Sequence, residues 1–436
     1  MNIEGLSKLA TITEFYLIKA VDAHTYCKFK VRTTEDEPFL KKKLGDTVNI
    51  KLQERDLLYG TIETFSVTET FSETWMEVEL YSTSIYEDRE KKVRVFQNTN
   101  KTYKDVLESL NSTSLEIKVK GKEGDGVISS LVFQVEETNF EFIKRIAKEI
   151  NAYVFVEDLS YGAPYLEISR QRAGQEKQIP LKHVKQYTCK RGINGEEVSI
   201  ALEEFLELGQ PVSLEGKSYV VTQVEIEMQR DVYKKHYKLS EKDYTVMQKI
   251  ESIAYEFEAK VVANKDSEGL GRLQLDFQLG KVEEKESTNR VWIPYMTPYA
   301  AATGGIVFLP EVGDIVRVQV MGEYVVATGM VRKEAVPKEF SKAQNKYIVS
   351  PLGRSIALTE EGIILQTKGS EMCLSDEGIT LKVGNNKVLL NEKICLVEAE
   401  GIELVAKGKM KIKADSDVSV SAGTVKIKGS SGVELG

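Results

Sequence analysis

The sequence predicts a mainly β fold that ends in a repetitive β rod. Short apolar or alternating runs, separated by turn residues, recur through most of the 436 residues. Only two stretches have the spacing of an amphipathic helix. The final segment repeats in eights, a period short enough to imply stacked strands. On the usual prior, a chain of this length holds about three domains.

Residues 1 to about 130 are predicted to be rich in strands. One helix is expected within Tyr103–Leu110, because Tyr103, Val106 and Leu110 fall on one face. Leu44-Gly45-Asp46 is a turn signal between strands. The strand-like runs are Phe15–Ile18, Cys27–Val31, Val48–Leu52, Leu58–Thr64, Trp75–Tyr81 and Val93–Phe96.

The clearest helix signal covers residues 139–150. Thr138 is a suitable N-cap, and Glu141 three residues later completes a capping box. A strand over Tyr153–Val156 follows at once. An apolar stripe at helical spacing is more often core than a ligand site, so we expect a structural helix packed on a sheet. The stripe comprises Phe140, Ile143, Ala147 and Ile150, with Ile146 beside it.

Short strands return after residue 160, and a compact β-domain is predicted at 255–335. The charged stretch Val232–Lys249 is interpreted as a linker. Five strands in some eighty residues suit a small closed barrel such as an OB-fold. The expected strands are Tyr165–Ile168, Val198–Leu202, Pro211–Leu214 and Ser218–Met228, then Phe257–Val262, Arg272–Gln278, Gly305–Leu309, Ile315–Val320 and Tyr324–Thr328.

The rod signal is strongest from Gly401, where apolar pairs recur at nearly constant phase in the octads GIELVAKG, KMKIKADS and DVSVSAGT. Within each pair the spacing is two, so each is predicted to be a short strand with one face in and one face out. One such strand cannot bury its apolar face alone, so it must stack on neighbours or on sister chains. Runs spaced like the octads precede them: Ile348-Val349, Ser355–Leu358, Ile363–Leu365, Ile379–Val383 and Val388–Leu390.

Composition excludes several classes of function. The net charge of −8 argues against nucleic acid, whose phosphates require a basic face, and against a polybasic membrane-surface protein. No run approaches the length of a membrane span, and the N-terminus lacks the pattern of a secretory signal. The four cysteines are far apart, as in a reducing cytosol. We therefore expect the protein to be made and assembled in the cytoplasm.

The sequence shows no catalytic residues, cofactor motif or metal-ligand spacing. His24, His183 and His236 are isolated. Pro310–Asp314 is a turn rather than an acid/base carboxylate pair, because Pro and Gly fix its dihedrals before a strand begins. Gly121–Gly126 lacks the Lys-Ser/Thr ending of a phosphate loop and is interpreted as a hairpin tip. Trp292, Tyr295 and Tyr299 lie among Pro and Met, so we interpret them as barrel core or trimer interface.

Two segments resemble one known family, the hub and spike proteins of contractile phage tails and the VgrG spikes of type VI secretion. Phe133–Ala147 is similar to the hub segment written Q-x-x-E-T-D-x-x-F-x-x-R-L-A. Trp292–Val320 is similar to the family's OB signature, and Gly271–Leu275 to the strand before it. The positions that carry the match are Gln134, Glu137, Thr138, Phe142, Arg145, Trp292, Pro310, Gly313 and Asp314.

The sequence departs from the family pattern at a few positions. Asn139 replaces the usual Asp, and Asn151 stands where a Gly often ends the helix; Asn tolerates the left-handed conformation needed there. Ala301 replaces a common Gly, and Met321–Tyr324 replaces the usual Gly-Asp-Pro loop. These differences concern the subfamily rather than the architecture.

The resemblance implies a non-enzymatic homotrimer in three parts. Residues 1–245 would form a phage-hub-like domain of two β-barrels with small α/β inserts, 255–335 an OB-fold collar, and 345–436 an intertwined triple-stranded β-helical spike. The implied partners are a hexameric inner-tube protein and baseplate proteins, with only transient contact with a target membrane. The protein would belong to a phage tail-like particle and would be released outside the cell on firing.

The tip of the rod is expected to come from another protein. The gap Arg332–Lys346 is too short for the lysozyme domain that some phage needles carry, and no His-x-His iron site follows the octads. We therefore expect a PAAR-like tip protein to dock on Val433, Glu434, Leu435 and Gly436.

Two other classes of function stay open from the sequence. A β-helical polysaccharide-degrading enzyme or tailspike would need a carboxylate or basic cluster on one face of the rod, and the octads show none in register. An OB-type nucleic-acid binder is disfavoured by the acidic balance. The sequence does not distinguish a phage tail, a tailocin, a type VI machine and an extracellular injection particle.

Overall fold

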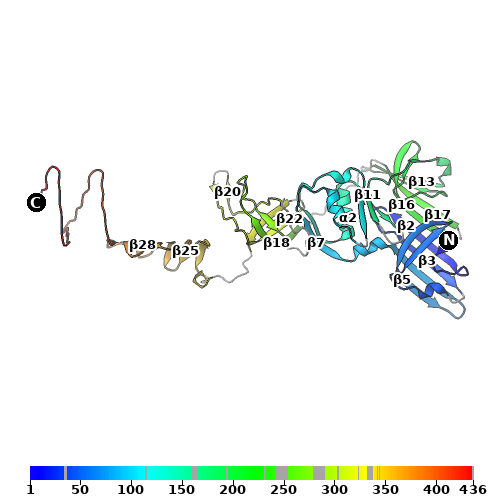
Figure 1. Cartoon of the computed structure of the whole chain (residues 1–436), viewed down its shortest axis with the longest axis horizontal. Helices are drawn as coiled ribbons and strands as arrows, with labels where there is room; N and C mark the ends of the chain where they lie inside the picture. Colours follow the sequence, from blue (N-terminus) through cyan, green and yellow to red (C-terminus); the bar gives the residue numbers. More distant parts are fainter. Residues whose placement is uncertain are drawn as a thin grey trace. The chain divides into compact units, whose positions relative to one another are not determined.

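A computed structural model gives the fold (Figure 1). It describes residues 1–33, 37–112, 115–159, 165–192, 195–229, 232–241, 254–277, 290–301, 304–322, 324–330, 337–340, 342 and 344–434. The chain divides into two units, Met1–Val331 and Arg332–Gly436. Strands dominate both units, as the sequence predicts, and the first unit adds two short α-helices.

A 12-stranded sheet forms most of the first unit, in the order β1-β4-β5-β6-β3-β2-β16-β17-β14-β13, with β12 and β15 attached at β16. Its strands alternate buried and exposed side chains; in β3, Cys27, Phe29 and Val31 face the core. The bounds are β1 Asn2–Ile3, β2 Thr11–Ala20, β3 Tyr26–Thr33, β4 Thr47–Leu52, β5 Arg55–Glu69, β6 Thr74–Ser82, β12 Lys177–Ile179, β13 Gln186–Gly192, β14 Gly195–Ala201, β15 Pro211–Leu214, β16 Lys217–Gln229 and β17 Val232–Glu241.

The linker predicted at Val232–Lys249 is wrong over its first part. Residues 232–241 form β17, which pairs with both β16 and β14. Buried Tyr237 and Leu239 alternate with Lys234, His236 and Lys238, so the charges belong to one face of a central strand. Residues 242–249 lie outside the described part of the chain.

A small α/β lobe interrupts the large sheet. It comprises β8 Glu116–Val119, β10 Tyr153–Glu157 and β11 Tyr165–Ser169 in the order β10-β11-β8, helices α1 Tyr103–Glu108 and α2 Asn139–Glu149, and the pair β7 Lys91–Phe96 and β9 Val132–Thr138. α2 buries Phe140, Phe142 and Ile143 in the core of this lobe. The helix predicted at 139–150 is therefore present, one residue shorter.

Both ends of α2 are closed by local hydrogen bonds. The Thr138 hydroxyl accepts from the Glu141 N–H, and the Glu141 carboxylate accepts from the Thr138 N–H. At the other end the N–H of Ala152 donates to the Ala147 carbonyl and that of Asn151 to Lys148. Asn151 has φ 55°, so it takes the left-handed position that Gly often fills.

The hairpin tip predicted at Gly121–Gly126 is wrong. Glu123–Asp125 forms a single 3-10 turn, η3. The strands on either side, β8 and β9, do not pair with each other, because β8 joins β11 and β9 joins β7.

The last part of the first unit is the OB segment. Its sheet has the order β19-β18-β22-β23, with β18 Ala254–Ala263, β19 Gln274–Asp276, β22 Ile315–Met321 and β23 Tyr324–Met330. Isolated bridges join Ile293 to Leu273 and Tyr295 to Ala327. They place residues 293–295 between β19 and β23. The strand predicted at Gly305–Leu309 is wrong: only Gly304–Gly305 (β21) pairs, with Ala300–Ala301 (β20), and residues 306–309 are irregular.

The second unit contains one antiparallel sheet of seven strands in chain order. The strands are β24 Lys346–Val349, β25 Ser355–Thr359, β26 Gly362–Gln366, β27 Ser370–Ser375, β28 Gly378–Val383, β29 Asn386–Leu390 and β30 Cys395–Glu398. The sequence did not predict β27 or β30. It predicts octad strands after Gly401, but the described residues 399–434 form none within the chain, since no strand of the same chain lies beside them.

Candidate functional site

The hub motif places Thr138 and Asn139 in a buried polar network at the start of α2. Thr138 donates its hydroxyl to Asp88, whose other carboxylate oxygen lies 3.0 Å from His24 Nε2. Asn139 Nδ2 donates to Glu87 at 2.6 Å. Burial lowers the pKa of His24, more strongly than the neighbouring Asp88 raises it. The network fixes the entry of α2 against the turn before β7.

Arg145 and Glu137 form the centre of the motif. The guanidinium donates from Nε and Nη2 to the two Glu137 oxygens at 2.7 and 2.8 Å, and Nη2 also donates to the Phe133 carbonyl. Burial acts to lower the pKa of Arg145, but the hydrogen bonds and charge of Glu137 outweigh it, so the pKa is raised. A two-point contact of this kind fixes direction as well as distance.

This pair stabilises an irregular stretch of β9. Glu136 has φ 52°, and the register between β7 and β9 shifts at this point, which marks a bulge. Buried Gln134 donates across the bulge to the Glu137 carbonyl at 3.1 Å. Arg145 therefore holds β9 at the position of its bulge.

The same strand contacts the OB segment. The Phe133 ring stacks on Phe257 at 5.8 Å and meets Phe277 edge-on at 5.7 Å. Val95 and Leu131 of the hub lie in the same apolar core as the OB residues. Strand β9, held by Arg145 of α2, thus joins the hub to the OB segment.

The OB motif residues Pro310, Gly313 and Asp314 form the turn that the sequence predicts. Gly313 has φ 105°, and its N–H donates to Val261 at 2.9 Å. The Asp314 carboxylate accepts from the Glu311 N–H at 2.8 Å. The buried Pro310 accepts a hydrogen bond from Asn264. Half-buried Trp292 lies beside Ile293, whose bridge to Leu273 ties this segment to the OB sheet.

The seven-stranded sheet has one apolar face without a cover. Residues directly opposite one another form a row across all seven strands: Ile348, Ile356, Leu365, Met372, Leu381, Val388 and Val397. A second row on the same face comprises Leu358, Ile363, Leu374, Ile379, Leu390 and Cys395. We call these two rows the apolar face.

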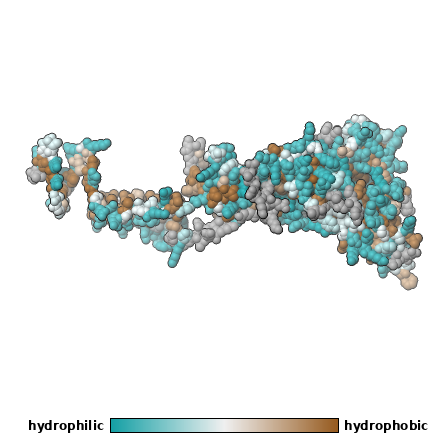
Figure 2. Space-filling model, viewed as in Figure 1, coloured by the Kyte–Doolittle hydropathy of each residue, from teal (hydrophilic) through white to brown (hydrophobic). Residues whose placement is uncertain are grey.

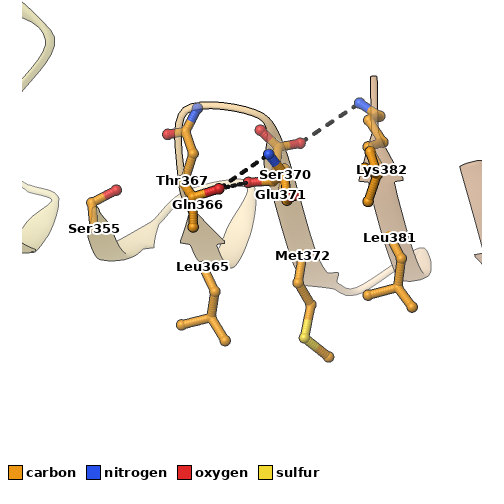
Figure 3. Close-up of a pocket in the computed structure, with 10 residues that line it drawn as sticks. Ser355, Leu365, Gln366, Thr367, Ser370, Glu371, Met372, Leu381 and Lys382 are labelled. Carbon is orange, nitrogen blue, oxygen red and sulfur yellow. Dashed lines mark hydrogen bonds and ion pairs between the residues drawn. The ribbon is translucent and has the colours of Figure 1, made fainter. Parts of the chain in front are cut away.

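The apolar face lies open to solvent. Ile348 is 53% exposed and Met372 40%, whereas fully buried core residues of the first unit are near zero. Figure 3 shows Leu365, Met372 and Leu381 pointing the same way from β26, β27 and β28, where they line a groove of about 440 Å³. Brown apolar atoms also reach the surface along the second unit (Figure 2). An uncovered face of this size marks an interaction surface.

The spacing of the apolar pairs changes where the sheet ends. Pairs begin at Ile356, Ile363, Met372, Ile379, Val388 and Cys395, so steps of seven and nine residues alternate, as hairpins with two kinds of turn require. From Ile402 the pairs begin at 402, 410, 418, 425 and 433, a nearly uniform step. These later pairs are exposed; Leu404 is 69% and Ile412 72% exposed.

Comparison with known proteins agrees with this arrangement. Residues 257–331 match the family model of the type VI secretion system/phage-baseplate injector OB domain. The E. coli c3393 protein, described as a type VI secretion component with structural similarity to T4 bacteriophage tail proteins gp27 and gp5, has TM-score 0.56 at 15% identity, over 76% of this chain and 99% of that chain. The chain has the fold of a VgrG-like baseplate spike.

A second solved structure supports the VgrG-like fold over more of the chain. A chain of the half-lidded Francisella PdpA–VgrG complex has TM-score 0.57 at 10% identity, over 91% of this chain and 87% of that chain. The lidless form gives the same TM-score over 89% and 93%. The comparison with curated proteins gives no match.

The structure brings together some of the predicted motif residues of this VgrG-like chain and not others. Gln134, Glu137, Thr138 and Arg145 share one network, with Phe142 beneath Arg145 at 5.2 Å. Pro310, Gly313 and Asp314 share the OB turn. Val433 is exposed at 47% and Glu434 is also exposed, while Leu435 and Gly436 lie outside the described residues.

Sequence reasoning missed several members of the hub network. Arg94 donates to Gln134 at 3.2 Å and to Asn139 at 3.0 Å, and Glu87 and Asp88 receive the motif's donors. These residues lie about 50 positions before α2, and only the fold brings them to it. Within the described ranges, no three His, Cys, Asp or Glu residues gather to hold a metal ion, and no helix is long and apolar enough to cross a membrane.

Proposed function

We propose that this VgrG-like chain is the trimeric hub and spike of a contractile injection system. The observation that carries the proposal is the apolar face of the second unit, continued by octad pairs that have no strand beside them in the described part of the chain. Both features require cover that one chain does not supply. The hub-like and injector OB folds in the same chain support the assignment.

Sister copies are the natural cover for both features. The nearly uniform step of the octads differs from the alternating steps of the hairpins before them, and the described octad residues pair with no strand of their own chain. Each pair needs a ladder partner of the same pattern, which a second and third copy supply at the same level. The product over residues 345–436 would be a three-chain β rod: three seven-stranded sheets pack by their apolar faces, and the octads intertwine as a triple-stranded β-helix. Its continuous hydrogen bonding would give stiffness and slow unfolding.

The remaining parts of the chain take the roles that the fold suggests. Residues 1–245 would form the ring that joins the spike to a hexameric inner-tube protein. Two similar β-barrels in each copy would present pseudo-sixfold symmetry to the tube. Residues 255–335 would form the collar, in contact with baseplate proteins.

Force transmission is the proposed mechanism, and it assigns no catalytic residue. Contraction would drive the tube and spike outward, and the stiff rod would breach the target envelope. Contact with the membrane would last only for that event. The particle would assemble in the cytoplasm and act outside the cell.

A separate tip protein of the PAAR-like kind is proposed to cap the rod at Val433, Glu434, Leu435 and Gly436. The exposed apolar Val433 supports this contact. A pull-down with candidate tip proteins tests it: binding that survives Val433→Asp unchanged contradicts docking at this site.

Mass measurement of the full-length chain under native conditions tests the central proposal. The expected result is three times the 49.0 kDa chain mass, resistant to detergent at room temperature. A monomer at all concentrations overturns the trimeric spike and returns the β-helical polysaccharide-degrading enzyme or tailspike to consideration.

A further inference from the structure

The OB segment contains the longest uncharged run of the sequence. No charged residue occurs between Arg290 and Glu311, a stretch of 20 residues, in a chain of which 29% is charged. The run includes Trp292, Tyr295, Tyr299 and Phe308. Ile293 within this run is buried in the OB core, but most of the described residues of the run are not buried. An uncharged stretch that is not core indicates a contact surface.

The structure pairs the described residues on the two sides of the outer part of this run. β20 pairs with β21, and at the base of the hairpin the Ile306 N–H donates to the Tyr299 carbonyl at 2.9 Å. Its foot is tied to β23, since the Met296 N–H donates to Ala327 at 2.8 Å. The backbone is fixed while the apolar side chains face solvent: Met296 52%, Tyr299 57%, Ile306 37%, Val307 76% and Phe308 63% exposed. We call these five residues the OB hairpin patch.

A second apolar patch lies at the other end of β22. The hairpin leads through Pro310 and the Gly313 turn into the first residues of β22. Met321 is the last residue of β22. Met321 and Tyr324 are direct cross-strand neighbours and are 47% and 54% exposed. Each copy of the OB segment therefore carries two separate apolar patches. A closed ring of identical copies requires two different surfaces that fit each other.

The charges of the OB segment favour a sister copy over a membrane. Membrane-surface hairpins combine apolar residues with Lys or Arg that attract anionic head groups. Here Arg272 is bound by Asp266 at 2.7 Å, and Arg317 lies 3.3 Å from Glu256. Glu311 directly follows the uncharged run.

The exposed area is sufficient for a specific contact. Five side chains of these sizes and exposures present roughly 500 Å² per copy. Met321 and Tyr324 supply only part of the facing area, so the surface around them would also be covered in a contact that buries on the order of 1,000 Å², near the lower limit for a specific interface.

We propose that the OB hairpin patch of each copy packs against Met321 and Tyr324 of the next copy, so that the OB segments close a ring of their own. This inference rests on the proposed trimer and adds a second contact to it, separate from the apolar face of the second unit. The collar would then stay closed without help from the rod.

Site-specific photo-crosslinking in the full-length chain tests the contact. A benzoylphenylalanine at Val307 is expected to give crosslinked dimers and trimers, with the link mapped to residues near Met321 or Tyr324 of another copy. The matched control carries the same group at Lys260, which is exposed on β18 of the same segment and lies outside both patches. The control is expected to give no crosslink above background.

The outcomes separate this inference from the proposed function. A native mass of one chain overturns the trimer itself. A trimer without a crosslink from Val307 leaves the spike intact and overturns the OB ring. Flotation with phosphatidylcholine–phosphatidylglycerol vesicles that is lost in Phe308→Ser assigns the patch to a membrane and also overturns the ring. Because Val307 is exposed, Val307→Glu should fold normally and lower only the urea concentration at which the trimer dissociates.

Discussion

Removing the Arg145 guanidinium tests whether α2 holds the junction between the hub and the OB segment. Arg145→Met keeps most of the aliphatic stem but removes both hydrogen bonds to Glu137 and the one to Phe133. The two side chains are 30% and 23% exposed, between the exposed and the buried classes of ion pair. Exposed pairs contribute about 0–1 kcal/mol, and breaking a buried pair costs about 3–5 kcal/mol. We expect a loss of about 2 kcal/mol of unfolding free energy.

The exposed pair Arg317–Glu256 provides a matched control in the OB segment. Its side chains are 49% and 46% exposed at 3.3 Å, so Arg317→Met should cost less than about 0.5 kcal/mol. Urea unfolding followed by fluorescence suits the measurement, because the chain has two tryptophans. Trp75 lies in β6 of the hub and Trp292 beside the OB core, so Trp75→Phe leaves a probe of the OB segment alone.

A double-mutant cycle with Glu137→Met then isolates the pair. We expect the two substitutions to be coupled. We also expect Arg145→Met to lose the Trp292 signal at a lower urea concentration than wild type. Equal effects of Arg145→Met and Arg317→Met, or additivity of the two substitutions in the cycle, would refute the reasoning.

Three further predictions concern other parts of the chain. Leu381→Asp in the apolar face should abolish the detergent-resistant trimer on a gel, whereas Lys387→Asp on the opposite face should leave it intact; equal behaviour contradicts the assigned interface. Gly313→Ala should cost about 1–3 kcal/mol through its φ of 105° alone, since nothing lies within 4 Å of the added carbon, while Gly329→Ala should be near neutral; calorimetry distinguishes them. Tyr219, Lys217 and Arg191 lower the pKa of Glu196 to about 2 from 4.5, so its contribution is present above pH 4.5 and lost as the pH falls toward 2. The difference in unfolding midpoint between wild type and Glu196→Gln should shrink as the pH falls through that window. A difference that stays constant contradicts the assigned contribution of the Glu196 carboxylate.

Local chemistry explains why α2 and the OB turn could be predicted from the sequence. The bonds of Thr138 with Glu141, and the left-handed positions of Asn151 and Gly313, depend on residues within a few positions of each other. The sequence prediction does not include β17, because the density of charge at Lys234, His236 and Lys238 resembles that of a linker. Buried Tyr237 and Leu239 alternate with those charges, and that alternation was the available signal.

Contacts between distant segments were not accessible from the sequence. Arg94, Asp88 and His24 join the hub motif only because β7 and the preceding turn fold beside α2. The octads show a different limit. Their apolar pairs predict strands, but a strand needs a ladder partner, and residues 399–434 find none within the described part of one chain.

The alternating steps of the seven-stranded sheet also set how its length can change. A step of seven residues followed by a step of nine makes one hairpin of 16 residues. Adding such a hairpin leaves the next strand in the same direction, with its apolar pair on the same face. Loss of a single strand would reverse the direction of every strand that follows. The chain would then leave the sheet at the opposite edge from the one where the octads begin. In the proposed triple-stranded β-helix the octads have no such constraint, because each repeat would continue in one direction. Evolution or design could then adjust the rod by single repeats after Gly401, but only by whole hairpins before it.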